Sequence, residues 1–124
     1  MRFLIQCVDE ASVQVDRNVT GAIEKGFLVL IGVTDTDDTQ IADRMIKKML
    51  GLRIFEDENH KTNLSLSDVE GSLLLVSQFT LYANCKKGNR PSFVKAGKPE
   101  HAHQLYEYII EQTRQSVSLS LIHI

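Results

Sequence analysis

The sequence predicts an α+β fold in one domain, and three observations support this prediction. The chain has 124 residues, which is the size of one ordinary domain. Residues 1–33 either alternate apolar with polar positions or run continuously apolar, as strands do, and they contain no helical period. Two later segments carry apolar residues at spacings of three and four, which is typical of helices that cover one side of a sheet.

The first third of the chain is expected to contain only strands, at residues 3–8, 11–15, 19–23 and 27–33. Polar turn residues separate them at Asp9-Glu10, Asp16-Arg17-Asn18 and Lys25-Gly26. The last of the four is a continuous apolar run, as expected for a strand covered on both faces. Because the strands follow one another through short turns, we expect an antiparallel meander.

Two amphipathic helices are expected. The first begins after one of several N-cap candidates in residues 34–38 and ends with Gly51 as its C-cap. Its apolar stripe is formed by Ile41, Ala42, Met45, Met49 and Leu50. A short strand at residues 52–55 follows. The second helix begins near Pro99, which suits a first helical position, and its stripe is formed by Ala102, Leu105, Tyr106, Ile109 and Ile110.

A second buried strand is expected from Ser72 to Tyr82, and its character changes midway. Its first half is aliphatic. In its second half, strand geometry puts Gln78, Thr80 and Tyr82 on one face and Ser77, Phe79 and Leu81 on the other. A polar face that grows out of a buried strand is a place where a functional site can be built.

Charge is distributed unevenly along the chain. Residues 71–99 contain no acidic residue, although the whole chain carries a net charge of -2. The same block contains five basic residues: Lys86, Lys87, Arg90, Lys95 and Lys98. Such a block either faces an anion or forms a solvated basic loop, and charge alone does not separate the two.

Several classes of protein are not indicated by the sequence. No apolar run is long enough to span a bilayer, and the start of the chain does not resemble a secretory signal. The cysteines, Cys7 and Cys85, make no disulfide framework, so we expect a reducing cytoplasm. No metal is expected, because two distant cysteines and four scattered histidines lack paired ligand spacing. Phosphate-cradling glycine loops and the serine-hydrolase motif are also absent.

The segment Gln78-Phe79-Thr80 leaves three interpretations open. Thr80 is either a nucleophile, which needs a nearby base that the local sequence does not supply, or simply a good strand residue. Alternatively, backbone N–H groups freed where the strand ends polarise a carbonyl as an oxyanion hole. The segment Arg90-Pro91-Ser92-Phe93 adds a cation, a rigid turn, a hydroxyl and an aromatic ring, which suit a phosphate and a stacked base.

Ser77-Gln78-Phe79-Thr80-Leu81, followed by Gly88-Asn89-Arg90-Pro91-Ser92-Phe93, resembles the signature region of the D-aminoacyl-tRNA deacylase family. The resemblance extends over nearly the whole chain, through framework segments in the family's order: residues 11–13, Gly21, residues 28–33, residues 51–55 and Asn63-Leu64. Two motifs at the right separation on this framework make a specific match.

The resemblance implies hydrolysis of the ester between a D-amino acid, or glycine, and the terminal adenosine of tRNA, which is a proofreading role in translation. It also implies a homodimer without metal or cofactor, built of mixed, partly open barrel-like sheets with helices packed outside. By resemblance, Ser77, Gln78, Phe79 and Thr80 line the aminoacyl pocket, with Gln78, Phe79 and Thr80 at the catalytic centre. The basic loop, with Lys86, Lys87 and Arg90 followed by Pro91, Ser92 and Phe93, would meet the RNA end.

The chain departs from the family pattern in two ways. Cys7 stands where the family has an arginine that helps to fix the pocket. The family's chirality filter is a Gly-Pro dipeptide, and neither proline of this sequence, Pro91 or Pro99, follows a glycine. We therefore expect residues 1–118 to form one deacylase domain that lacks its last strands, and residues 119–124 to be a non-native tail that resembles a translated sequencing adapter. The alternative function is a non-catalytic remnant that binds the tRNA 3′ end.

Overall fold

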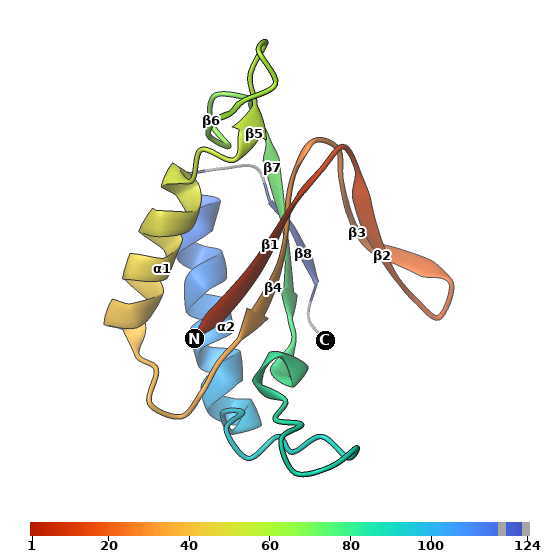
Figure 1. The fold of residues 1–124 in the computed structure, drawn as a ribbon, viewed down its shortest axis with the longest axis vertical. Helices are drawn as coiled ribbons and strands as arrows, with labels where there is room; N and C mark the ends of the chain where they lie inside the picture. The colour runs from red at the N-terminus through yellow and green to blue at the C-terminus, as the bar shows by residue number, and fades with distance from the viewer. Residues whose placement is uncertain (117–118, 123–124) are drawn as a thin grey trace.

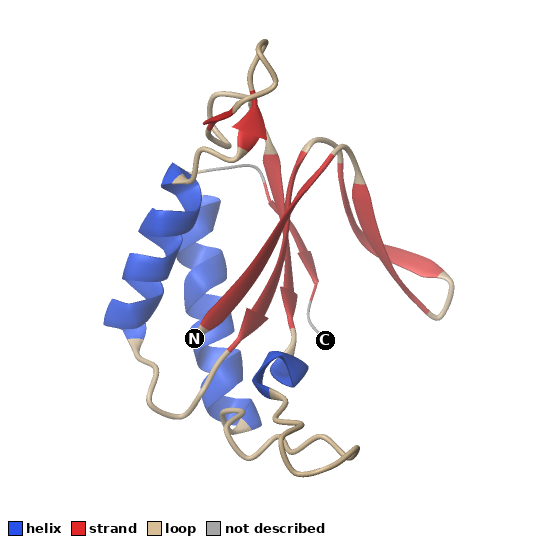
Figure 2. Ribbon diagram, in the orientation of Figure 1, coloured by secondary structure: helices blue, strands red, loops and turns tan. Residues whose placement is uncertain are grey.

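The computed structural model describes residues 1–116 and 119–122 as a mixed β-sheet with two helices on one face (Figures 1 and 2). A short 3-10 turn, η1, follows the central strand. In chain order the elements are β1 (Arg2–Val8), β2 (Ala11–Val15), β3 (Asn18–Ile23), β4 (Gly26–Gly32), α1 (Thr39–Gly51), β5 (Phe55–Glu56), β6 (Thr62–Leu64), β7 (Ser72–Ser77), η1 (Phe79–Tyr82), α2 (Pro99–Arg114) and β8 (Leu119–Ile122). The α+β prediction is confirmed.

The main sheet has the strand order β1-β4-β7-β8, and the predicted meander is wrong. Strand β1 pairs antiparallel with β4, not with β2, while β4–β7 and β7–β8 are parallel pairs. Strands β2 and β3 form a separate hairpin between β1 and β4 in the chain. Strand β1 does not pair with β2, nor β3 with β4, because β4 is apolar on both faces and the hairpin packs against one of them.

The helical face of the sheet carries the main core. Alternate residues of β4, Phe27, Val29 and Ile31, are buried there together with Leu73 and Leu75 of β7. The helices contribute the buried residues Ala42, Ile46, Met49, Leu105, Tyr106, Ile109 and Ile110. Both helical stripes are therefore confirmed in essence, and Ile46 is a core residue that the predicted stripe omitted.

The opposite face of the sheet carries a smaller core. Leu74 and Val76 of β7 are buried there with Ile23 of the hairpin, and Leu28 and Leu30 of β4 pack against them. Figure 1 shows the β2–β3 hairpin projecting on the side of the sheet away from α1 and α2. The run predicted to be covered on both faces is thus covered by helices on one face and by the hairpin on the other.

The helix ends follow local chemistry. Asp38 is the N-cap of α1, and its carboxylate accepts the N–H of Ile41 at 2.9 Å. Gly51 lies inside α1 and Leu52 is the C-cap, so the predicted glycine cap is wrong by one residue. Because Leu52 ends the helix, the strand expected at residues 52–55 is reduced to Phe55–Glu56. Pro99 begins α2 as predicted.

Strand β8 is formed by residues 119–122, which belong to the segment expected to be a non-native tail. Its backbone pairs parallel with β7, with Leu119 opposite Leu73 and Ile122 opposite Val76. The rest of that segment, residues 123–124, lies outside the described residues, as do residues 117–118. The division into a domain at 1–118 and a tail at 119–124 stays a prediction.

Within the described ranges, no helix is long and apolar enough to cross a membrane.

Candidate functional site

The site is built where the chain leaves the end of β7. Gln78 is still extended, with φ of -142° and ψ of 94°, but Phe79–Tyr82 form η1. The strand predicted to continue to Tyr82 is therefore wrong, and the alternation of faces beyond Ser77 does not apply. The physical reason lies in the neighbouring strand, since β4 ends at Gly32. A Cβ atom at Gly32 would lie 3.0 Å from Cβ of Leu81, so the glycine lets η1 pack over that end.

The turn releases backbone donors from the sheet. The N–H of Gln78 still donates to the carbonyl of Ile31 at 2.8 Å, as a strand residue would. The next two N–H groups, those of Phe79 and Thr80, open η1 and meet no acceptor within the described residues. The first turn of a helix leaves its N–H groups without internal partners. These two donors are thus available to an external oxygen atom.

The side chains of Gln78 and Thr80 are engaged with each other. The Gln78 amide Nε2 donates to Oγ1 of Thr80. Among the described residues, no histidine, lysine or carboxylate forms a hydrogen bond with the Thr80 hydroxyl, and an amide is not a base. The arrangement orients the hydroxyl without activating it.

A cavity of about 670 Å³ opens beside this turn. Ser77 and Phe79 line it from the β7–η1 corner, while Phe93 lines it from the loop before α2. The rings of Phe79 and Phe93 meet edge to face with centroids 5.2 Å apart. Phe79 keeps 58% of its surface exposed, so its ring is accessible to a ligand. Of the residues predicted from the two motifs, the structure brings these three together in one cavity.

The loop before α2 is fastened to the segment after β4. The N–H of Gly97 donates to the carbonyl of Val33 at 2.7 Å, and the N–H of Lys98 donates to Oδ1 of Asp35 at 2.9 Å. The Thr34 hydroxyl donates to the carbonyl of Lys95 at 2.5 Å. A Cβ atom at Gly97 would lie 3.0 Å from that Val33 oxygen, so the close approach needs glycine. These contacts fix the wall that carries Phe93.

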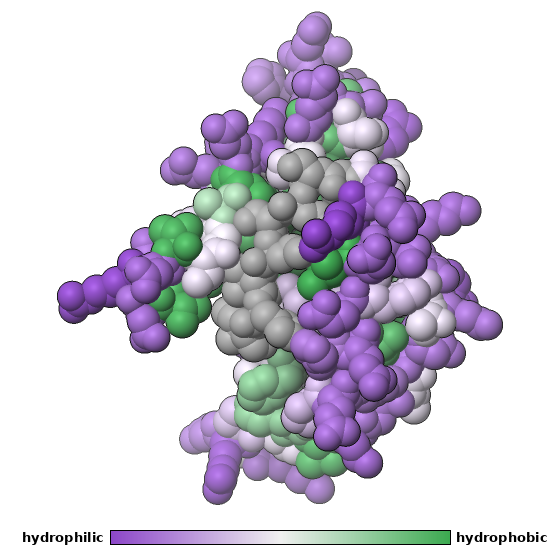
Figure 3. Space-filling view, turned by 180° about the vertical axis from the view of Figure 1, so that it is seen from behind, coloured by the Kyte–Doolittle hydropathy of each residue, from purple (hydrophilic) through white to green (hydrophobic). Residues whose placement is uncertain are grey.

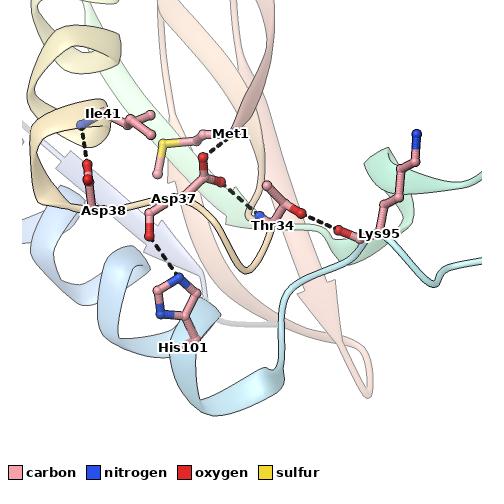
Figure 4. A network of polar contacts seen from close by, with 7 residues as sticks. All are labelled: Met1, Thr34, Asp37, Asp38, Ile41, Lys95 and His101. Atoms are coloured by element: carbon pink, nitrogen blue, oxygen red, sulfur yellow. Dashed lines mark hydrogen bonds and ion pairs between the residues drawn. The ribbon is translucent and has the colours of Figure 1, made fainter.

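Asp37 anchors the same segment through its carboxylate and its carbonyl oxygen (Figure 4). Its carboxylate accepts the N–H of Thr34 at 2.8 Å and pairs with the amino group of Met1, also at 2.8 Å. Its carbonyl oxygen lies 2.9 Å from Nε2 of His101 on α2. In the sequence, Asp37 was one of several N-cap candidates for the first helix, but Asp38 is the cap. Asp37 instead links Met1 at the start of β1, Thr34 in the loop after β4, and His101 on α2.

The residues of the basic loop separate into two groups. Asn84 and Ser92 exchange backbone hydrogen bonds of 2.8 Å, which closes the loop between them. Lys87, Arg90 and Pro91 lie exposed in this closed loop and line no described cavity. Lys86 instead lines a smaller cavity at the end of η1, together with Tyr82.

The sequence motifs missed several residues of the cavity. Asp35, Lys98 and His103 line it together with the start of α2, yet none of them belongs to a recognised motif. Lys98 was visible only as part of the basic block. Cys7, in turn, lies outside the cavity: it is exposed on β1 opposite Phe27, and its Sγ lies 3.6 Å from the carbonyl of Ile54. Partial burial raises the pKa of the Cys7 thiol, and the charge of Lys25 opposes this rise.

A family model described as D-Tyr-tRNA(Tyr) deacylase matches residues 4–123. The chain belongs to this deacylase family. The chain is 54% identical over 114 residues to the D-aminoacyl-tRNA deacylase of Clostridioides difficile, covering 92% of this chain and 76% of that protein. It is 45% identical over 121 residues to the D-aminoacyl-tRNA deacylase of Thermosipho melanesiensis, covering 98% and 81% respectively.

Solved structures agree with the deacylase assignment of the fold. The structure named "c-Myc DNA Unwinding Element Binding Protein" superposes with a TM-score of 0.89 at 35% identity, covering 99% of this chain and 85% of that one. A second, named "Structural Analysis of a probable eukaryotic D-amino acid tRNA deacylase", has a TM-score of 0.78 at 18% identity, covering 91% and 66%. The second supports the fold alone.

Membership of this family confirms the prediction that the chain is a hydrolase, because the D-aminoacyl-tRNA deacylases that are 54% identical to it are hydrolases. Among the described residues there is no group of three histidines, cysteines or carboxylates that could hold a metal ion. The roles of individual residues in this deacylase-family chain stay predictions.

Proposed function

We propose that this chain hydrolyses the ester bond between a D-amino acid and the 3′-terminal adenosine of a tRNA. The relatives named D-aminoacyl-tRNA deacylase support the substrate class. One structural observation carries the mechanism: the N–H groups of Phe79, which lines the cavity, and of Thr80, the next residue, meet no acceptor within the described residues. Such a pair of fixed donors suits the carbonyl oxygen of an ester, which becomes negatively charged when the carbonyl is attacked.

In the proposed reaction, a water oxygen bonds to the acyl carbon while the two N–H groups donate to the carbonyl oxygen. The bond between the acyl carbon and the ribose 3′-oxygen then breaks, and the leaving oxygen takes a proton. The vicinal 2′-hydroxyl of the ribose is the group that supplies and relays protons here. The Gln78–Thr80 hydrogen bond supports this assignment over attack by Thr80, because the hydroxyl is oriented by an amide rather than by a base.

The cavity has room for a small acyl group beside its aromatic wall. Ser77, Phe79 and Phe93 surround the position where the ester would lie. Phe79 and Phe93 present ring surface to the terminal base or to the amino acid side chain. Glycine fits the same position because it has no side chain to clash, so glycyl-tRNA is a second proposed substrate. The loop with Lys87 and Arg90 would follow the RNA backbone by charge.

A second copy of the chain is the proposed protein partner. Leu4 on the edge strand β1 is 50% exposed, and Val19 on the hairpin is 58% exposed. Figure 3 shows apolar surface gathered on the projecting hairpin. Apolar side chains beside an unpaired strand edge favour association. Sedimentation would show a dimer that Val19→Lys weakens, whereas an unchanged distribution would exclude the hairpin from the interface.

The proposed compartment is the cytoplasm, where charged tRNA meets the ribosome.

The test of the catalytic proposal is release of labelled tyrosine from D-Tyr-tRNA, with L-Tyr-tRNA as the control substrate. The proposal requires hydrolysis of the D-ester above the spontaneous rate. Binding of the tRNA without any hydrolysis would favour the alternative of a non-catalytic module for the RNA 3′ end. Neither binding nor hydrolysis by the folded protein would overturn both functions.

A further inference from the structure

A second, smaller cavity lies at the end of η1, where Tyr82 lines it, whereas Phe79 lines the proposed acyl cavity at the start of η1. It measures about 240 Å³ and is lined by three cations, Arg2, Lys86 and Lys95, together with residues 82–85. We refer to it as the cationic notch. Arg2 comes from the start of β1, and the other two come from the two arms of the basic loop. The fold therefore gathers charges from positions 2, 86 and 95, of which the motif resemblance included only Lys86.

The cationic notch has no carboxylate in its lining. Within the described residues, none of the ion pairs includes Arg2, Lys86 or Lys95. Asp37, the carboxylate whose charge reaches Tyr82, is buried and already paired with the amino group of Met1. Three like charges around one small hollow repel each other, and an anion placed between them relieves that repulsion.

Contacts with η1 and with the loop that follows it hold Arg2 and Lys86 in place. Nη1 of Arg2 donates to the carbonyl of Leu81 at 2.6 Å, and its guanidinium lies 4.5 Å from the centroid of the Tyr82 ring. An arginine fixed by one hydrogen bond and a ring still has other N–H donors to offer. The N–H of Lys86 donates to Oδ1 of Asn84 at 3.0 Å, which fixes its position next to the turn.

Lys95 is anchored in the same manner. Its carbonyl accepts the Thr34 hydroxyl, while its side chain extends away from the Asp37 network (Figure 4). The Thr34 hydroxyl contacts only the backbone of Lys95, so the ammonium group of Lys95 stays available for a ligand. Substitution of the Lys95 side chain would therefore remove the charge and leave this anchor intact.

The cationic notch and the acyl cavity share two walls. In η1, Phe79 lines the acyl cavity and Tyr82 lines the notch. In the loop before α2, Phe93 and Val94 line the acyl cavity, and the next residue, Lys95, lines the notch. A ligand that spans η1 would reach both. An aminoacylated RNA end has this shape, because a phosphodiester is attached to the nucleoside that carries the ester.

We propose that Arg2, Lys86 and Lys95 form a phosphate-binding site that holds a backbone phosphodiester of the RNA 3′ end while the ester lies in the acyl cavity. This inference rests on the proposed function, of which it specifies the RNA-binding part. Guanidinium and ammonium groups are the usual partners of phosphate oxygens. The site would align the terminal nucleoside without reading its base.

The kinetic test compares two substrates, a D-tyrosyl ester of adenosine, which has no phosphate, and a D-tyrosyl ester of the trinucleotide CCA. The variant is Arg2→Gln with Lys95→Gln, and the control is Lys61→Gln on the distant β5–β6 loop. We expect the variant to lower the preference in kcat/KM for the trinucleotide by about tenfold, mainly through KM. Equal losses on both esters would leave the preference unchanged and would overturn the proposal, because the notch would then only support the fold.

A binding test does not depend on hydrolysis, so it separates failure of the phosphate site from failure of the proposed function. Uncharged CCA trinucleotide is titrated at several salt concentrations. Loss of a phosphate contact should make the fall of log K with log salt less steep. The double variant should show this reduction, and Lys61→Gln should not. An unchanged slope would overturn the proposal even in an inactive protein.

Inorganic phosphate is the other source of the same chemistry. If the site is built for RNA, inorganic phosphate should compete with the trinucleotide only at far higher concentration. Competition at equal concentration would assign the notch to free phosphate and overturn the RNA assignment. The kinetic and binding tests also use the single variant Lys95→Gln, because Arg2→Gln removes the packing of Arg2 on the Tyr82 ring as well as a charge. Thermal melting of each variant checks that it is folded.

Discussion

The side-chain amide of Gln78 donates a hydrogen bond to the hydroxyl of Thr80, two residues further along the chain. These two polar side chains of the signature motif thus bind each other at the corner between β7 and η1. This leaves the backbone N–H groups of Phe79 and Thr80 as the free donors of the corner within the described residues. Variants of Thr80 and Phe79 separate the contribution of these backbone donors from that of the side chains.

Thr80→Ala should retain activity within about tenfold of the parent, because it removes one hydrogen bond and no catalytic base or nucleophile. A substrate ending in 2′-deoxyadenosine, esterified at its 3′-oxygen, should by contrast be almost inert. Single-turnover release of D-tyrosine measures both. A loss on the order of 10⁴ or more for Thr80→Ala, with full activity on the deoxy substrate, would make Thr80 the nucleophile.

Phe79→Pro should lower kcat by a further factor of about 10² to 10³ compared with Phe79→Ala. Both variants remove the ring, but only proline removes the N–H donor. Gln78 has the extended backbone that a residue before proline prefers, and Phe79 is the first residue of η1, where proline is tolerated. Equal activity of the two variants would show that this N–H takes no part in catalysis.

Gly26→Ala and Gly51→Ala should change stability in opposite directions. A Cβ at Gly26 would lie 1.8 Å from the backbone oxygen of Ser72, at the first pair of the β4–β7 ladder, so we expect a loss of about 1–3 kcal/mol. A Cβ at Gly51 meets nothing within 4 Å, and alanine in the last turn of α1 should stabilise by roughly 0.5–1 kcal/mol. Urea unfolding measures both, and a stable Gly26→Ala would contradict the tight strand pairing.

Asp57 should contribute to loss of stability in acid. The backbone N–H groups of Lys61 and Asn59 donate to its carboxylate and lower its pKa below the ordinary value of 3.8. A folded-state pKa below the unfolded one means that the contribution is full above pH 3.8 and is lost as pH falls through the lower folded value. Asp57→Asn should therefore flatten the decline of the unfolding free energy below pH 3.8. The control is Glu58→Gln, which removes a neighbouring exposed carboxylate. In this control the unfolding free energy should decline more steeply in acid than it does in Asp57→Asn.

Much of the local structure follows from the sequence. The apolar stripes at spacings of three and four place both helices, because a helix must bury one face and the stripe marks it. The run at residues 27–33 predicts a strand covered on both faces, and both cores include residues of β4. The motifs around Ser77 and Arg90 identify the deacylase family, since their residue types and separation are specific.

Only the tertiary structure decided where these elements meet. Alternation in a sequence does not say which strands pair, so β1 joined β4 while the hairpin between them covered the far face of the sheet. The turn at Phe79 depends on β4 ending at Gly32, which no pattern within residues 72–82 contains. Arg2 lies 79 residues from Leu81 in the chain, yet it donates to that carbonyl. Contacts of this kind arise from burial of apolar faces across the whole domain, and burial is a property of the assembled chain rather than of any one segment.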